Sequence, residues 1–200
     1  MPKGFTDNER IKIEKELFNT GRTLFIEHGF KKTSVSKITD AVGIAKGSFY
    51  LFYDSKEELF IDILERIEDV IQNEIIEEIE ASTLPAPQLF KSILRTRLRS
   101  ATNDPIIQMT LQGDVIQRIW SKLPESRKKV NIEKDARFIE KFILARPDAV
   151  VMFEHDSEKL AGVFRSLFFL ILHKVEIGEH VFEDVLDFMV DASVDKLFRK

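Results

Sequence analysis

The sequence predicts an all-α protein of about nine helices, and three observations support this. Apolar residues recur at spacings of three and four through most of the 200-residue chain. Capping patterns, glycines and prolines fall where these apolar runs begin and end. The chain contains no alternating strand pattern bracketed by hairpin turns, no internal repeat and no low-complexity tract.

The N-terminal part is divided by short-range patterns. Thr6 and Glu9 have the spacing of a capping box and open a first helix, which we expect to stop at Gly29. Ser34 can cap a short second helix that ends at Gly43. Another short helix follows this tight turn.

A long helix then begins at a second capping box, Ser55 and Glu58, and continues to about residue 80. We expect about five more helices after it. Their boundaries are proline or glycine patterns: the loop at 82–87, Asp104 with Pro105, Pro124, Pro147 and Gly178.

Composition restricts the class of protein. A hydrophobic content of 44% is enough for a substantial core, and the absence of cysteine excludes disulfides and thiolate metal sites. The N-terminus does not resemble a signal peptide, and no run reaches the roughly 20 apolar residues of a membrane-spanning helix. We therefore expect a soluble cytoplasmic protein with no membrane contact.

The net charge of −4 hides two opposite segments. Residues 31–56 contain five lysines against two aspartates, a net charge of +3, whereas residues 57–80 contain ten acids against one arginine, a net charge of −9. Phosphate groups would be attracted to the first segment and repelled by the second.

Two short helices around a glycine turn form a helix-turn-helix, whose second helix enters the DNA major groove. Here that second helix would run to about Phe52. The side chains expected to face inward are Val35, Ile38, Val42, Ile44 and Phe49. Those left available for DNA are Ala45, Lys46, Gly47, Ser48 and Tyr50. By pattern alone, the same segment equally fits two short helices in any helical protein.

A family resemblance favours the DNA-binding interpretation. The pattern G-F-x-x-T-S-V-x-x-I-x-x-A-V-G-I-A-K-G-S-F-Y-x-x-Y-x-S-K-E-E-L-F, at residues 29–60, resembles the DNA-binding domain of TetR/AcrR-family transcriptional regulators. The resemblance implies a DNA-binding domain at residues 1–55 and an effector-binding and dimerisation domain at 56–200, with the helix at about 55–80 connecting them. It also implies a two-fold dimer that binds a palindromic operator on double-stranded DNA, with recognition helices about one DNA turn, roughly 34 Å, apart.

The resemblance assigns contacts position by position. The implied DNA-binding residues are Thr33, Ser34, Ala45, Lys46, Gly47, Ser48, Tyr50 and Lys56. The chain departs from the family at Thr39, where alanine is common, and at Phe52 and Tyr53, where Tyr or His followed by Phe is frequent. Phe52 has no polar atom for the usual contact, and a buried Tyr53 is the alternative to a DNA contact.

The C-terminal half offers two apolar helices for dimerisation. The segment 157–173 contains six consecutive apolar residues, and the last helix repeats apolar residues at a spacing of three to four. Given the resemblance, we expect a four-helix interface between subunits, with the interior of a monomer as the alternative. The expected interface residues are Phe164, Leu167, Phe168, Ile171, Phe182, Leu186 and Met189.

An effector pocket is expected among the apolar side chains of the C-terminal half, so the effector would be largely apolar. The candidates are Phe90, Leu94, Met109, Gln112, Ile116, Trp120, Phe138, Phe142, Phe164 and Phe168. Lys91, Arg95 and Arg99 form a basic row at four-residue spacing. This row could meet an anionic effector, but salt bridges to the acidic helix at 57–80, or plain solvation, are the favoured interpretation.

The predicted function is that of a ligand-responsive homodimeric regulator, most often a repressor. Histidine spacing gives no metal site, no cofactor is implied, and the absence of a P-loop, nucleophile elbow or HExxH pattern gives no reason to assign an enzyme. Two alternatives stay open. One is an α-helical small-molecule-binding protein or enzyme with a vestigial DNA-binding domain, and the other is an interaction module that binds a different protein through its last two helices.

Overall fold

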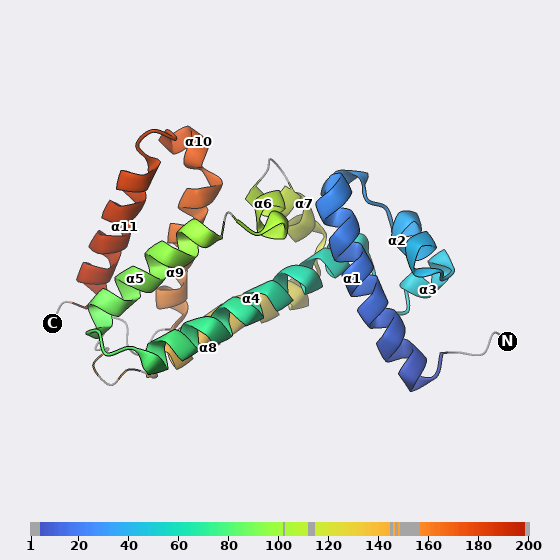
Figure 1. Ribbon diagram of the computed structural model, residues 1–200, viewed down its shortest axis with the longest axis horizontal. Helices are drawn as coiled ribbons and strands as arrows, with labels where there is room; N and C mark the ends of the chain where they lie inside the picture. The colour runs from blue at the N-terminus through green and yellow to red at the C-terminus, as the bar shows by residue number, and fades with distance from the viewer. Residues whose placement is uncertain are drawn as a thin grey trace. The chain divides into compact units, whose positions relative to one another are not determined.

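The computed structural model describes residues 5–101, 103–111, 115–144, 146, 148 and 157–198. These residues form helices without any strand, so the all-α prediction is confirmed (Figure 1). The helices are α1 (Asp7–Lys32), α2 (Val35–Val42), α3 (Lys46–Phe49), α4 (Lys56–Ala81), α5 (Ala86–Ser100), α6 (Pro105–Leu111), α7 (Val115–Lys122), α8 (Glu125–Leu144), α9 (Ser157–Leu172), α10 (Lys174–Ile177) and α11 (Phe182–Leu197). The described part has more helices than expected because residues 105–122 form two short helices and α10 precedes Gly178.

Short-range sequence patterns set the helix ends. The Thr6 backbone N–H donates to the Glu9 carboxylate at 2.8 Å, and the Glu9 N–H donates to the Thr6 hydroxyl at 3.3 Å, which completes the predicted capping box. Gly29 adopts φ 77° and ψ 159°, so the regular helix stops there and one further turn completes α1. At the start of α4, the Ser55 hydroxyl accepts from the Glu58 N–H at 3.1 Å.

The chain divides into two compact units. Unit 1 comprises the chain up to Glu68 together with Pro105–Leu123, and unit 2 comprises Asp69–Asp104 together with the chain from Pro124 onward. The division falls inside α4, and α5 of unit 2 is followed in sequence by α6 of unit 1. Unit 1 is therefore built from two separate stretches of the chain.

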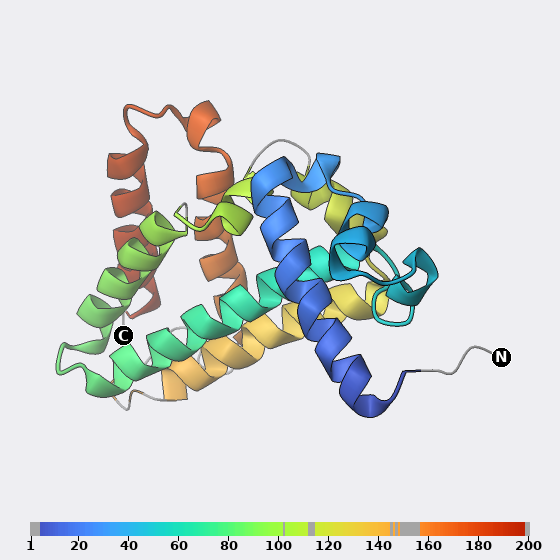
Figure 2. The same ribbon diagram turned by 45° about the vertical axis from the view of Figure 1, so that its right-hand side comes forward.

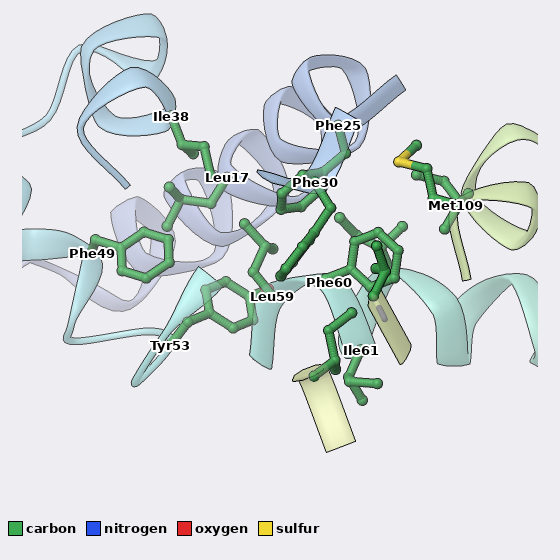
Figure 3. Packing of buried hydrophobic residues seen from close by; sticks show 14 of the residues in the cluster. Leu17, Phe25, Phe30, Ile38, Phe49, Tyr53, Leu59, Phe60, Ile61 and Met109 are labelled. Atoms are coloured by element: carbon green, nitrogen blue, oxygen red, sulfur yellow. The ribbon is translucent and has the colours of Figure 1, made fainter. Parts of the chain in front are cut away.

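One hydrophobic core joins the two stretches of unit 1. Leu17, Phe25 and Ile38 are fully buried, and the ring of Phe60 meets that of Phe25 edge-on at 5.2 Å. The later stretch adds buried residues to the same core, and Met109 lies beside Phe25 and Phe60 (Figure 3). The later stretch contributes Ile106 and Met109 from α6, Val115 and Ile119 from α7, and Leu123, which directly follows α7.

Unit 2 is a bundle in which α5, α9 and α11 pack side by side (Figures 1 and 2). Helix α8 also packs on α9. The ring of Phe90 meets that of Phe198 edge-on at 5.0 Å. Residues buried on α5, α9 and α11 are Ala86, Leu89, Phe90, Ile93, Leu98, Leu160, Ala161, Leu167, Ile171, Phe182, Leu186, Val190, Val194 and Leu197. Within the described part of the chain, no helix combines the length and the apolar character needed to cross a membrane.

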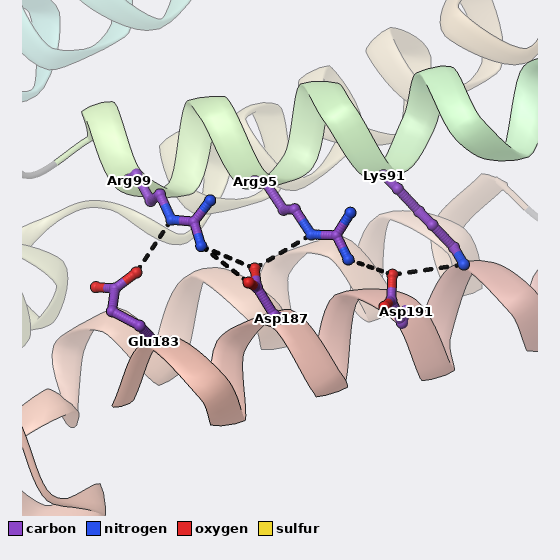
Figure 4. A network of polar contacts seen from close by, with 6 residues as sticks. All are labelled: Lys91, Arg95, Arg99, Glu183, Asp187 and Asp191. Carbon is purple, nitrogen blue, oxygen red and sulfur yellow. Dashed lines mark hydrogen bonds and ion pairs between the residues drawn. The ribbon is translucent and has the colours of Figure 1, made fainter. Parts of the chain in front are cut away.

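A charged ladder joins α5 to α11 (Figure 4). Lys91 lies 2.7 Å from Asp195 and 3.4 Å from Asp191, and the Asp195 carboxylate raises the pKa of Lys91. Arg95 pairs with Asp187 and Asp191, and Arg99 pairs with Asp187 and Glu183. We define the charged ladder as these three cations and four carboxylates.

The ladder corrects the expected partner of the basic row. The sequence favours ion pairs with the acidic helix at 57–80, or plain solvation, for this row, but its three members meet acids of α11. Arg97 meets that acidic helix instead, at 2.7 Å from Glu74 and 3.4 Å from Glu78. The physical reason is helical geometry, because residues two apart point to different sides of a helix.

Candidate functional site

The turn between α2 and α3 is fixed by the backbone. The Ser34 hydroxyl accepts from the Lys37 N–H at 3.2 Å and caps α2, as predicted. Gly43 has φ 78° and ψ 30°, a left-handed conformation that glycine adopts without steric cost. The N–H groups of Gly43 and Ile44 both donate to the Thr39 carbonyl, at 2.9 and 3.0 Å. The chain therefore reverses sharply and presents α3 beside α2.

The inward face of this pair is the predicted one. Ile38 and Phe49 are fully buried in the core of unit 1, next to Leu17 (Figure 3). The other three residues expected to face inward, Val35, Val42 and Ile44, are partly buried and pack against the same core. Helix α3 has only four residues, and backbone hydrogen bonds from Leu51 and Phe52 to Ser48 and Phe49 continue it as a turn.

The outward face carries small and basic residues. Ala45, Lys46, Gly47 and Tyr50 are exposed, and Ser48 is partly exposed. Three lysines at the end of α1 and on α2 are also exposed, namely Lys31, Lys32 and Lys37. Sequence reasoning counted these three lysines in the local charge but did not place them among the contacts. We add these three lysines to the candidate DNA-binding surface because they are exposed.

Gly47 has no structural need to be glycine. Its φ is not positive, and a Cβ atom added to it would meet nothing within 4 Å. The missing side chain therefore leaves open space on the outer side of α3. Such a position allows the backbone of a partner molecule to approach the helix closely.

Thr33 lies in the connection between α1 and α2, and Lys56, the first residue of α4, reaches this connection with its side chain. The Thr33 hydroxyl lies 3.0 Å from the carbonyls of Leu24 and Gly29, and the residue is 1% exposed. The Lys56 ammonium donates to the carbonyls of Phe30 and Thr33, both at 2.7 Å, and burial lowers the pKa of Lys56. Two of its three hydrogens are thus used, and the ammonium also lies 4.4 Å from the centre of the Phe30 ring.

A part-buried ion pair connects α7 to the start of α4. Glu57 is 3% exposed, and the Lys122 ammonium lies 2.8 Å from its carboxylate. Glu57 is adjacent in sequence to Lys56, and its charge opposes the lowering of the Lys56 pKa by burial. Sequence reasoning missed this pair, because 65 residues separate the partners and only the apolar spacing of α7 hinted that this helix is buried.

The two residues that depart from the family pattern have separate environments. Tyr53 is buried, and its hydroxyl donates to the Asp62 carboxylate at 2.9 Å, which together with burial raises the tyrosine pKa. Phe52 is partly buried, with the guanidinium of Arg10 5.4 Å from its ring and the ring of Phe5 at 6.1 Å. Both aromatic rings therefore pack within unit 1.

The candidate pocket residues fall into both units. Met109, Ile116 and Trp120 belong to unit 1, whereas Phe90, Leu94, Phe138, Phe164 and Phe168 belong to unit 2. Gln112 and the side chain of Phe142 lie outside the described residues. In unit 2, Phe138 and Phe164 pack against the same small cluster of Leu160, Ala161 and Leu197. Phe138 also lines a groove of about 210 Å³ between α4 and α8.

The expected interface residues differ in exposure. Four of them are buried inside unit 2, namely Leu167, Ile171, Phe182 and Leu186. Phe164 and Phe168 are partly buried, and Met189 is 36% exposed. Sequence reasoning missed the two largest exposed side chains of these helices, Phe169 at 53% and Phe188 at 70%. Because α9 and α11 are each apolar on more than one face, the spacing of apolar residues does not identify which face is exposed.

Comparison with known proteins places a family pattern on unit 1. Residues 17–63 match the profile of bacterial regulatory proteins of the tetR family. The HTH-type transcriptional repressor KstR2 of Rhodococcus jostii (strain RHA1) is 37% identical over 81 residues, which are 40% of this chain and 39% of that protein. The probable acrEF/envCD operon repressor of Escherichia coli (strain K12) is 34% identical over 55 residues, 28% of this chain and 25% of that protein. The chain thus matches well under half the length of these relatives.

Similarity of fold extends further along the chain. A TetR-family transcriptional regulator from Pectobacterium atrosepticum superposes with a TM-score of 0.64 and 19% identity. The superposition covers 96% of this chain and 94% of that one. The fold of both units is therefore shared, while the sequence similarity is concentrated in the helix-turn-helix.

Proposed function

We propose that the chain is a member of the tetR family of bacterial regulatory proteins, a homodimeric repressor that binds a palindromic operator and is released by a small-molecule effector. The observation that carries this proposal is the outward face of α2 and α3. That face combines an open Gly47 with exposed Lys37 and Lys46. Cations supply phosphate contacts, and the small residues allow close approach to the groove.

The proposed functional division follows the family. Residues 1–55 bind DNA, residues 56–200 hold the effector and the partner subunit, and the helix at about 55–80 connects them. The proposed DNA contacts are Ser34, Ala45, Lys46, Gly47, Ser48 and Tyr50, with Lys37 added. Lys56 contributes its remaining N–H to a phosphate, and Thr33 positions α2 through its internal hydrogen bonds. A repressor of this kind acts on chromosomal DNA, so we place it in the cytoplasm.

We infer that the second subunit covers an apolar stripe on α11. Val181, Val185, Phe188, Met189 and Ala192 recur at spacings of three and four and are exposed or partly exposed. Phe169 adds an exposed ring from α9, which packs beside α11. A stripe of this kind on each of two subunits matches the self-complementary interface of a two-fold dimer. We call these six residues the α11 stripe.

The route from effector to DNA passes through α6 and α7 in this proposal. These helices follow α5 in sequence and are buried in the core that also holds α2 and α3. Lys122 of α7 holds Glu57, whose neighbour Lys56 holds the carbonyls of Phe30 and Thr33. A shift of α7 would therefore displace the segment that leads from α1 into α2. An effector that favours the shifted state would lower operator affinity.

The test is selection from a randomised DNA duplex pool, followed by affinity measurements at several salt concentrations. We expect an enriched palindrome, with affinity that falls steeply as salt rises. Lys46→Ala should weaken binding and reduce the magnitude of the salt slope by about 1 per subunit. Lys129→Ala is the matched control, because Lys129 lies on α8 and its side chain is 78% exposed.

Failure to enrich any sequence at low salt would contradict the proposal. If the protein then bound or converted small molecules, the small-molecule carrier or enzyme with a vestigial DNA-binding domain would become the better description. Equal effects of the Lys46 and Lys129 substitutions would remove α3 from the DNA contacts.

A further inference from the structure

The groove in unit 2 has one face from each of two helices. Helix α8 runs alongside the second half of α4 (Figure 2). The groove has a volume of about 210 Å³. Its lining residues are Gln72, Asn73 and Ile76 from α4 and Lys134, Arg137, Phe138 and Lys141 from α8. Spacings of three and four place each set on a single side of its helix.

The charge of the groove is opposite to that of the helix beside it. Residues 57–80 have a net charge of −9, yet the α4 residues that line the groove are two amides and an isoleucine. Helix α8 supplies three cations. Lys134 lies 2.7 Å from Asp69, and Arg137 lies 3.7 Å from Glu133 on its own helix, with its side chain 64% exposed. The groove therefore presents positive charge and amide N–H donors.

Apolar atoms form the rest of the lining. Ile76 is 8% exposed, and Phe138 is partly buried against the cluster of Leu160, Ala161 and Leu197. For scale, a buried cavity of about 150 Å³ is known to hold a benzene molecule. A groove of about 210 Å³ is therefore large enough for one ring or a short alkyl chain together with a small polar group.

We propose that this groove binds a small organic carboxylate, an anion with an apolar body of about one ring, and that this is the effector. The apolar body packs on Ile76 and Phe138, and the carboxylate accepts hydrogen bonds from Arg137 and Lys141. The planar guanidinium fork matches a carboxylate better than an ammonium does. The amide of Gln72 or Asn73 donates to the remaining lone pairs. The effector role, although not the binding itself, rests on the proposed function.

Calorimetric titration of the full chain with sodium benzoate and with sodium hexanoate tests the proposal. At about 50 mM salt, where screening is weak, we expect binding of at least one of them and tenfold weaker binding of benzyl alcohol, which lacks the charge. Arg137→Gln and Lys141→Gln should each weaken carboxylate binding by about tenfold, because each removes a charge-assisted hydrogen bond. Asn73→Asp should weaken it further, because it adds a negative charge to the groove.

Lys129→Gln is the control, since it removes one positive charge from α8 without touching the groove. Circular dichroism confirms that each variant is folded. Binding that is unchanged in the Arg137, Lys141 and Asn73 variants, or that falls equally in the Lys129 variant, would overturn the proposal. So would the absence of binding of both carboxylates at about 10 mM, a concentration at which an effector site should be filled.

The DNA measurements separate this proposal from the proposed function. A carboxylate that binds with the expected variant pattern and weakens operator binding supports both. Binding with that pattern and unchanged operator affinity overturns the effector role. Failure to select an operator overturns the repressor, whereas the calorimetric result for the groove stands independently.

Discussion

Among the glycines of unit 1 that the structure describes, Gly47 is the one without an internal reason to be glycine. Gly21 is needed for packing, because a Cβ atom there would lie 2.7 Å from the Leu59 Cδ2 atom. Gly29 and Gly43 have positive φ, which side-chain-bearing residues rarely adopt. Gly47 has neither constraint. At the scale of single residues, this is the clearest sign of a contact outside the chain.

We expect Gly47→Ala to leave the fold intact and to impair DNA binding. Alanine favours helix over glycine by roughly 0.5–1 kcal/mol, so the free energy of unfolding should stay the same or rise. The added methyl group would separate α3 from the DNA and lower operator affinity by about tenfold or more. Urea denaturation and operator binding, measured on the same preparation, check both expectations. An unchanged operator affinity would show that Gly47 does not face DNA.

Sequence reasoning recovered the exposed face of the helix-turn-helix because the spacing in a short segment determines which side chains point outward. It could not recover the environment of Thr33 and Lys56. Their partners are the backbone carbonyls of Leu24, Gly29 and Phe30. Every residue has the same backbone carbonyl, so a sequence pattern does not reveal which one accepts the hydrogen bond. Both residues match the family pattern, yet only the structure shows that they bond within the chain.

At the scale of helices, the charged ladder lines the contact between α5 and α11. Its contacts run antiparallel, from Lys91 with Asp191 to Arg99 with Glu183 (Figure 4), and Asp195 adds a second partner for Lys91. Sliding α5 by one turn would pair each cation with a different acid, because both rows repeat every four residues. The apolar core below therefore selects one register, and the ladder reinforces it.

The ladder should stabilise the protein in a salt-dependent way. Arg95→Ala is expected to lower the free energy of unfolding by about 1 kcal/mol at low salt, since exposed ion pairs contribute 0.2–1 kcal/mol each. At about 1 M NaCl the Debye length falls to roughly 3 Å, so most of this loss should disappear. A double-mutant cycle with Asp191→Ala, followed by urea denaturation, isolates the pair. A coupling energy near zero at low salt would contradict this interpretation.

Local patterns predicted most helices of the chain but not all of their partners. The helix starts at Thr6, Ser34, Ser55 and Pro105 depend on neighbouring residues, so the sequence was sufficient for them. The burial of α6 and α7 in the core of unit 1 depends on contacts across 40 residues or more, and no short-range pattern reports those. The same limit explains why the basic row of α5 was assigned to the wrong helix.

At the scale of the whole molecule, the α11 stripe is the apolar surface that a second copy would cover. Phe188 is 70% exposed and Phe169 is 53% exposed, although both lie on helices whose other faces form the core of unit 2. Large aromatic side chains at the centre of an interface often dominate its binding energy. Two-fold symmetry uses each such side chain twice.

We expect Phe188→Lys to disrupt the proposed dimer and leave a monomer. The substitution places two like charges at the interface, so the dissociation constant should rise by about 100-fold or more. Sedimentation velocity over a range of concentrations measures this, and operator affinity should fall in parallel. Val175→Lys is the control, because Val175 is 73% exposed on α10 and lies outside the stripe. A Phe188 variant that sediments like the unmodified protein would place the interface elsewhere.

The split of unit 1 between two stretches of the chain has a consequence for synthesis. During translation, the segment up to Glu68 emerges first, and Ile106, Met109 and Ile119 are not yet available to complete the core that contains Phe60. The nascent helix-turn-helix must wait for the end of α7 before its core closes, which raises contact order and slows folding. A fragment ending at Glu68 would expose part of that core and aggregate readily. The DNA-binding part is therefore not an autonomous module that could be cut out and grafted onto another protein.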